Sequence, residues 1–298
     1  MKDIKSEESR IVDNGLLKYY RGFRRGKDLL NVNRHAGFKF VTKAVGVNNI
    51  SADGVLHYLV TPEGLYYTKF LSKKEIDAEV LISQLYPKLG LKCATYLPVG
   101  EKSTYTGVVS NDVRAIDTVP ANQHNKAMSN SLDKSIHIVG KNPLHLPYDS
   151  NLVNVDYSKF ITKNGMRSLQ IKRMADTASY NTDGREENFF YVLKDGIIDD
   201  VVSYDNAMSG PFCEGLTNSY ENEFSAHRLY RNGMINQFRE NETLQTFISP
   251  IEMAETIGSV DVIETAKDIK RETGYKVEPQ YVDAIARSYE SMAEDLTR

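Results

Sequence analysis

The stretch NTDGREENFFYVLKDGIIDDVVSYD, residues 181–205, decides how we expect the chain to fold. Its first eight residues are polar, charged or small, and an abrupt aromatic and aliphatic run follows them. Two short apolar runs of the kind found in β-strands flank Asp195-Gly196, a pair that favours a tight hairpin turn. Because a hairpin folds the chain back, Asp205 is predicted to return close to Asn188.

The polar residues ahead of the hairpin have a spacing with chemical meaning. Asp183 and Asn188 match the D-x-x-x-x-N pattern of a phosphoryl-transfer catalytic loop. The aspartate can orient or accept the proton of an attacking hydroxyl, and the asparagine amide oxygen can bind Mg²⁺. With Asp205 brought back to it, Asn188 would complete a magnesium site for nucleotide phosphates. Taken alone, the spacing also arises by chance, and Asp205 also suits an ordinary turn.

Upstream, the sequence predicts a small β-rich unit with one helix. Strand-like runs alternate with turn residues, and one segment has the spacing of an amphipathic helix. The expected strands are 54–60, 64–70, 94–100 and 104–110, and the expected helix is 73–86.

Lys69 and Glu79 fall on two neighbouring elements of this unit. Strand alternation places Lys69 on one face of its strand together with apolar and aromatic neighbours, and a buried amine needs an opposite charge. Glu79, flanked by apolar positions of the following helix, can supply it. A strand lysine paired with a helix glutamate is how protein kinases hold nucleotide phosphates. Without further context, such residues are more often two separate surface charges.

A candidate phosphate-binding turn precedes these residues. In NNISADGVLHYLV, residues 48–60, Ser51 and Gly54 lie between two expected strands. Small residues there would let backbone N–H groups approach phosphates. A simple Asp-Gly hairpin turn explains the same residues equally well.

The second half of the sequence is predicted to be mainly helical. The segment 114–152 has an irregular pattern, and its three histidines lack metal-ligand spacing; they are His124, His137 and His145. Four later segments have helical periodicity, the clearest being 249–258 with Ser249 as cap, Pro250 in the first turn and Glu252 at the capping-box position. The expected helices are 165–180, 249–258, 260–274 and 278–296.

Composition indicates a globular protein. The 298 residues are 41% hydrophobic and 26% charged, with a net charge of −3, so no global basic field suggests nucleic-acid binding. The basic segment 18–27 is interpreted as a solvated helix end or loop, with phosphate contact or partner docking as the alternative. Cys93 and Cys213 form no metal or disulfide pattern. Without a signal peptide or an apolar run of membrane-spanning length, we expect a cytoplasmic location.

In order along the chain, YYTKF, EIDAEVLISQLYPKLGLKCATYLPV, GVVSNDV, SYNTDGREENFFYVL and YDNAMSG resemble the HipA-like family of bacterial serine/threonine protein kinases. The resemblance spans about residues 50–210. It implies the α+β, two-lobed protein-kinase-like fold, distantly similar to phosphoinositide 3/4-kinases. Residues 1–112 would form the β-rich small lobe with an N-terminal extension, and 113–298 the mainly helical large lobe.

The resemblance also implies roles for the residues singled out above. Lys69 would hold the α- and β-phosphates of ATP, Glu79 would orient it, and Asp183 would be the catalytic base. Asn188 and Asp205 would bind Mg²⁺. The segment containing Ser51 and Gly54 is similar to the family's phosphate loop, which is autophosphorylated in some members, with Ser51 as the candidate residue.

The sequence departs from the family at three points. Arg185 stands where relatives often have histidine, and the phosphate loop lacks the usual lysine near its end. The N-terminus is shorter than in toxin members, so the resemblance carries over neither a toxin role nor an antitoxin partner.

From the resemblance and these residues, we expect an ATP- and Mg²⁺-dependent kinase of a protein substrate. The alternatives are a nucleotide-binding pseudokinase that docks a partner, and a kinase of a lipid or small-molecule hydroxyl.

Overall fold

The structure is a computed structural model, and it describes most of the chain between residues 57 and 124 and beyond 160. The described residues are 39–41, 57–61, 64–101, 104–111, 118–124, 160–181, 184, 188–207, 209–210 and 231–298. The basic segment 18–27 and the residues Cys213, His137 and His145 lie outside them.

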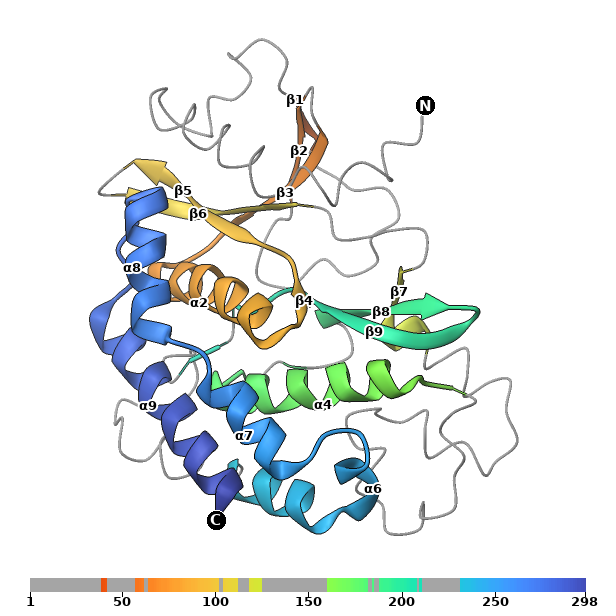
Figure 1. Cartoon of the computed structure of the whole chain (residues 1–298). Coiled ribbons are helices and arrows are strands. Elements are labelled where there is room, and N and C mark those ends of the chain that lie inside the picture. Colours follow the sequence, from red (N-terminus) through yellow and green to blue (C-terminus); the bar gives the residue numbers. More distant parts are fainter. Residues whose placement is uncertain are drawn as a thin grey trace.

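A five-stranded antiparallel sheet forms the small lobe (Figure 1). The strand order is β1-β2-β3-β6-β5, and the hairpins expected from the sequence are present. The bounds are β1 Lys39–Val41, β2 His57–Thr61, β3 Gly64–Phe70, β5 Tyr96–Glu101 and β6 Thr104–Asn111. The sequence did not predict β1, because three residues are too few for alternation to be visible.

The predicted helix of the small lobe is present as α2, Lys73–Leu85, followed by the 3₁₀ turn η3, Tyr86–Leu89. Ser72 caps α2, and Glu75 reaches back to the Ser72 N–H, so both halves of a capping box are made. The helix packs against β5 and β6 on one side and against helix α8, Val262–Thr273, on another. Its residues from Ile76 to Ser83 and Leu85 are buried, while Lys73 and Lys74 in its first turn are exposed.

A second, four-stranded sheet lies beside the first (Figure 1). Its order is β4-β9-β8-β7, with bounds β4 Lys92–Cys93, β7 Thr118–Pro120, β8 Phe189–Lys194 and β9 Ile197–Ser203. The predicted hairpin is β8–β9. Asp195 and Gly196 form its turn with φ of 54° and 79°, the positive values that the tight hairpin turn requires.

Two features of this sheet were not predicted. Strand β4 comes from the small-lobe part of the sequence but pairs in parallel with β9, with Cys93 opposite Ser203. Strand β7 pairs with β8, and residues 121–124 form a helical turn. The interpretation of 114–152 as irregular is therefore wrong at 118–124, where β8 supplies a pairing partner from a distant part of the sequence.

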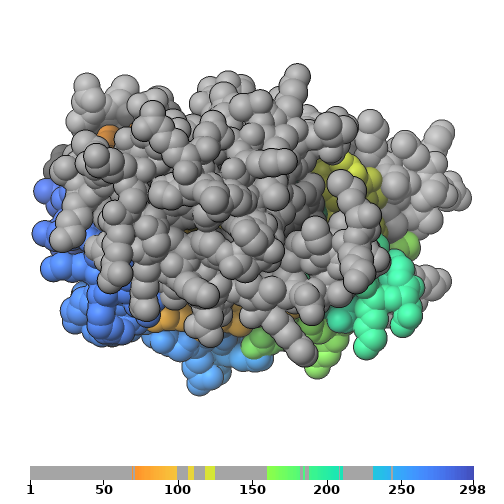
Figure 2. All heavy atoms as spheres, turned by 90° about the horizontal axis from the view of Figure 1, so that it is seen from above, coloured from red at the N-terminus to blue at the C-terminus, as the bar shows by residue number. Residues whose placement is uncertain are grey.

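The large lobe is helical. Its elements are α4 Lys163–Ala178, α6 Glu242–Gln245, α7 Pro250–Gly258, α8 and α9 Pro279–Thr297, together with a helical stretch at 231–240. Helix α4 packs on β9, and α7 packs along α9. Seen from above, the C-terminal helices in blue and the β8–β9 hairpin in teal lie at opposite ends of the described part (Figure 2).

Of the capping box predicted at the start of α7, only the Ser249 cap is confirmed. Ser249 accepts a hydrogen bond from the Glu252 N–H at 3.1 Å, as a cap should. The Glu252 side chain, however, accepts from the Arg167 guanidinium of α4, with the shortest contact at 2.9 Å. This ion pair links α4 and α7. The Glu252 side chain therefore joins the two helices instead of completing a capping box.

Buried side chains of both lobes form one continuous hydrophobic core that includes residues of α2, α4, α7, α9 and the second sheet. The expected α+β, two-lobed fold is therefore confirmed, with a small sheet lobe and a helical lobe sharing one core. None of the helices within the described residues is long and apolar enough to cross a membrane.

Candidate active site

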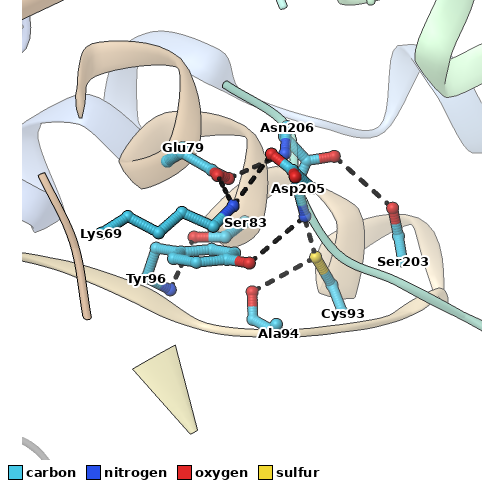
Figure 3. A network of polar contacts seen from close by, with 9 residues as sticks. All are labelled: Lys69, Glu79, Ser83, Cys93, Ala94, Tyr96, Ser203, Asp205 and Asn206. Carbon is cyan, nitrogen blue, oxygen red and sulfur yellow. Dashed lines mark hydrogen bonds and ion pairs between the residues drawn. The ribbon is translucent and has the colours of Figure 1, made fainter. Parts of the chain in front are cut away.

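Lys69 lies at the meeting point of the two lobes (Figure 3). Its ammonium nitrogen is 2.7 Å from Glu79 Oε1 on α2 and 2.8 Å from Asp205 Oδ1, which follows β9. The Lys69 side chain is 17% exposed and that of Glu79 is fully buried. One cation thus connects three segments, so Lys69 and Glu79 are not two separate surface charges.

Backbone groups after β9 complete this arrangement. Glu79 Oε2 accepts a hydrogen bond from the Asn206 N–H at 2.8 Å, so the glutamate uses one oxygen for each lobe. Tyr96, on β5, accepts from the Asp205 N–H at 3.2 Å, and Lys69 Nζ lies 5.1 Å from its ring centroid. The backbone of the Asp205–Asn206 segment is therefore held by two small-lobe side chains, Glu79 and Tyr96 (Figure 3).

Burial and charge act differently on the two members of the ion pair. Burial alone lowers the pKa of Lys69, but Glu79, Tyr96 and Asp205 outweigh it and raise that pKa well above its usual range. Burial is also the largest influence on Glu79, and it raises the pKa of Glu79 to about 7 against the opposing effect of Lys69. Lys69 thus stays charged, and the glutamate is the member that titrates near neutral pH.

The hairpin brings Asp205 back to the neighbourhood of Asn188. The Tyr204 N–H donates to the Asn188 carbonyl at 3.1 Å, and Phe189 lies opposite Ser203 in the sheet. Asp205 has a φ of 58°, in the left-handed region that aspartate tolerates better than most residues. The hairpin geometry predicted from the sequence is therefore present.

The side-chain chemistry of Asn188 and Asp205 suits Mg²⁺. Both offer hard oxygen donors, and Mg²⁺ is usually held by one or two carboxylates together with substrate phosphates. Among the described residues, no group of three or more His, Cys, Asp and Glu side chains could hold a metal ion.

Three of the predicted site residues lie outside the described part of the chain. They are Ser51 and Gly54 of the proposed phosphate loop and Asp183, the proposed catalytic base. Arg185 lies outside it as well.

A buried polar cluster that the sequence did not reveal lies next to Asn181 and Gly184. The Asp176 carboxylate accepts from Lys172 at 2.6 Å, from the Tyr86 hydroxyl at 2.5 Å and from the Asn181 amide at 3.2 Å. The only hint in the sequence was the separation of Lys172 and Asp176 by four residues in a predicted helix, which places them on one face. Tyr96 and Asn206 gave no comparable signal.

Cys93 is a half-buried free thiol. Its Sγ lies 3.8 Å from the Asn206 amide and 3.3 Å from the Ala94 carbonyl (Figure 3). Burial raises the pKa of the thiol, so Cys93 stays protonated. It packs beneath the Asp205–Asn206 segment and supplies no nucleophile.

Comparison with known proteins identifies the fold. No family model matches the chain, and no curated protein matches its sequence. Among solved structures, it is similar to a Helicobacter pylori proinflammatory kinase, CtkA, with a TM-score of 0.52 and 15% identity over 86% of this chain and 91% of the other. At that identity the likeness is one of fold, and the kinase-like fold expected from the sequence is confirmed at that level.

A weaker similarity is to HipA of Shewanella oneidensis, in a structure of the toxin–antitoxin system HipA and HipB with operator DNA. The TM-score is 0.35, with 12% identity over 87% of this chain and 72% of that one. This score is too low to add to the argument.

Proposed function

We propose that the chain is an ATP- and Mg²⁺-dependent phosphotransferase, and more narrowly a HipA-like serine/threonine protein kinase. The observation that carries this proposal is the position of Lys69 between Glu79 and Asp205, in a fold similar to that of a kinase. In protein kinases a strand lysine paired with a helix glutamate holds the nucleotide phosphates, and a separate aspartate binds Mg²⁺.

In this proposal, each residue acts through charge and position. Lys69 binds the α- and β-phosphates, and Glu79 holds the ammonium group in the direction of the nucleotide. Asn188 and Asp205 hold Mg²⁺, which supplies neutralisation of the charge on the phosphates when it is bound. Asp183 orients the acceptor hydroxyl and accepts its proton.

Nucleotide binding requires Asp205 to exchange partners. Its carboxylate is 2.8 Å from Lys69 Nζ, the same ammonium group that is proposed to face the phosphates. Glu79 keeps Lys69 in place during that exchange, because its bonds to Lys69 and to the Asn206 N–H do not involve the Asp205 carboxylate. Residues around Ser51 and Gly54 are proposed to cover the phosphates, with Ser51 as the candidate autophosphorylation site.

A binding and turnover experiment tests this proposal. Mg²⁺-dependent binding of ATP and release of ADP would be measured for the wild type and for Lys69→Met. Lys267→Met is the matched control, because Lys267 is an exposed lysine paired with Glu264 at 3.0 Å on α8. We expect Lys69→Met to lose at least about 100-fold in kcat/KM, on the scale of a group that stabilises the transition state, and the control to retain wild-type values.

The same experiment separates the proposed kinase from its rivals. Tight Mg-ATP binding by the wild type without ADP release, whatever acceptor is offered, would favour a nucleotide-binding regulatory protein. Transfer to a lipid or a small-molecule hydroxyl, but not to any protein, would support phosphoryl transfer and reject a protein as the acceptor. Equal activity of Lys69→Met and wild type would overturn the proposal.

A further inference from the structure

The polar cluster next to Asn181 and Gly184 contains a buried ion pair that the chemistry proposed above does not use. Lys172 Nζ lies 2.6 Å from Asp176 Oδ2 on helix α4, and the two side chains are 1% and 9% exposed. Removing both charges from water is costly, and apolar residues of similar volume often give equal or greater stability at such sites. Stability alone therefore does not explain why the pair is there.

The carboxylate end of the pair contacts the first half of the loop 181–188. Asp176 Oδ1 accepts from the Asn181 side-chain amide at 3.2 Å, and the Asn181 N–H donates to the Asp176 carbonyl at 2.8 Å. Gly184 approaches so closely that an added Cβ would lie 2.7 Å from Asp176 Oδ2. Asp176 thus lies against Gly184, the residue that follows Asp183 in the sequence.

The ammonium end of the pair contacts the chain where the loop ends. Lys172 Nζ lies 4.9 Å from the ring centroid of Phe189, which directly follows Asn188. A cation near an aromatic ring in a buried site is attracted to it. The single pair Lys172–Asp176 therefore contacts Asn181 and Gly184 at one end and Phe189, the residue after Asn188, at the other.

A third contact connects the cluster to the small lobe. The Tyr86 hydroxyl donates to Asp176 Oδ1 at 2.5 Å, and Tyr86 follows directly after α2, the helix that carries Glu79. This contact joins α4 to the residue that follows α2, and it is separate from the bond from the Asn206 N–H to Glu79.

We propose that Lys172 and Asp176, with Tyr86, are positioning residues that hold Asn181, Gly184 and Phe189, and through them the loop 181–188, relative to α2. The activity part of this inference rests on the proposed phosphotransferase function. Since the cluster touches the loop and not the expected nucleotide, its loss should reduce kcat and leave the KM for Mg-ATP unchanged. A misplacement of about 1 Å costs on the order of 100-fold in rate, and we expect a loss of that size.

The test removes the polar cluster without leaving an unpaired buried group. The variant Tyr86→Phe/Lys172→Met/Asp176→Leu replaces all three groups by apolar side chains of similar shape, so the unfolding midpoint should stay near that of the wild type. The matched control is Arg167→Met/Glu252→Leu, which removes the exposed ion pair between α4 and α7. The control should change neither kcat nor the amide hydrogen exchange of residues 181–188.

Amide hydrogen exchange of peptides covering 181–188 provides a readout that needs no activity. We expect exchange in the triple variant to rise at least about tenfold in the loop, while α4 keeps its protection. If the triple variant does not fold, Asn181→Ala, which removes only the side-chain contact of the loop, takes its place with the same expected direction.

The outcomes are distinguishable. Unchanged loop exchange overturns the inference, as does faster exchange with an undiminished kcat in an active enzyme. If the wild type neither binds nor turns over ATP but loop exchange rises as expected, the proposed function fails and the positioning role stands.

Discussion

Glu79→Gln separates the catalytic role of the site from its contribution to stability. The substitution keeps the shape of a fully buried side chain and an oxygen for the Asn206 N–H, while it removes one negative charge. Lys69 keeps a partner, because Asp205 Oδ1 is 2.8 Å away. The wild-type cluster has two carboxylates for one ammonium group, so the variant retains a balanced pair.

The stability effect follows from the raised pKa. Burial raises the pKa of Glu79 from 4.5 to about 7, so the folded state binds this proton more readily than the unfolded state does. Glu79 therefore lowers stability progressively as pH rises from about 4.5 to about 7, and its full cost is present above pH 7. This rise in pKa corresponds to at most about 3.5 kcal/mol. Glu79→Gln should be more stable than wild type at pH 8, with the difference vanishing below about pH 4.

The activity effect has the opposite sign. The variant loses a charge-assisted hydrogen bond to Lys69, worth about 1.5–3 kcal/mol, which corresponds to about 10- to 150-fold in kcat/KM at pH 8. In the wild type, kcat/KM should fall as pH drops through about 7 and Glu79 takes up a proton. The variant should lack that decline, because glutamine does not titrate.

The assays are Mg-ATP kinetics and urea unfolding of both proteins between pH 5 and pH 8. Glu264→Gln, at the exposed pair with Lys267, is the control and should behave as wild type. A Glu79→Gln protein with wild-type kcat/KM, or one destabilised by about 3 kcal/mol or more at pH 8, would refute this reasoning, since that loss is typical of breaking a required buried pair.

Three further changes test other parts of the structure. Asp183→Ala should leave the unfolding midpoint unchanged and reduce transfer by about 10²- to 10⁴-fold, the range for loss of a general base, as measured with labelled ATP. Gly210→Ala should lower stability by about 2–4 kcal/mol in urea unfolding, because φ is +110° and an added Cβ would lie 2.2 Å from the Tyr281 ring. Tyr275→Phe should cost about 1–3 kcal/mol in the same assay, because it removes the buried 2.7 Å hydrogen bond to Asp77. A loss of stability in the first variant, or none in the other two, would contradict these expectations.

Local patterns were sufficient to predict the elements that carry the site. Helical spacing identified α2, and the pair Asp195-Gly196 identified the β8–β9 hairpin, because in both cases the signal lies within the element itself. The hairpin also correctly predicted that the chain returns to Asn188. The contact between Lys69 and Glu79 could also be predicted, because the two residues lie on consecutive elements.

The remaining contacts depend on packing between distant segments. Tyr96 bonds to a residue 109 positions away, and Asn206 bonds to Glu79 across 127 positions. Strand β7 forms only because β8 offers an edge to a short segment that has no alternation of its own. Burial of Lys172 and Asp176 likewise depends on what covers α4, and sequence periodicity does not report that.

The most direct test of the proposed function is to incubate the protein with γ-labelled ATP and Mg²⁺ and to locate the label by tandem mass spectrometry. We predict a phosphate on a serine or threonine hydroxyl, either of this chain or of an added protein acceptor, and its loss in Lys69→Met. Absence of labelled product and of ATP consumption with protein, lipid and small-molecule acceptors alike would contradict the assignment of this site to phosphoryl transfer.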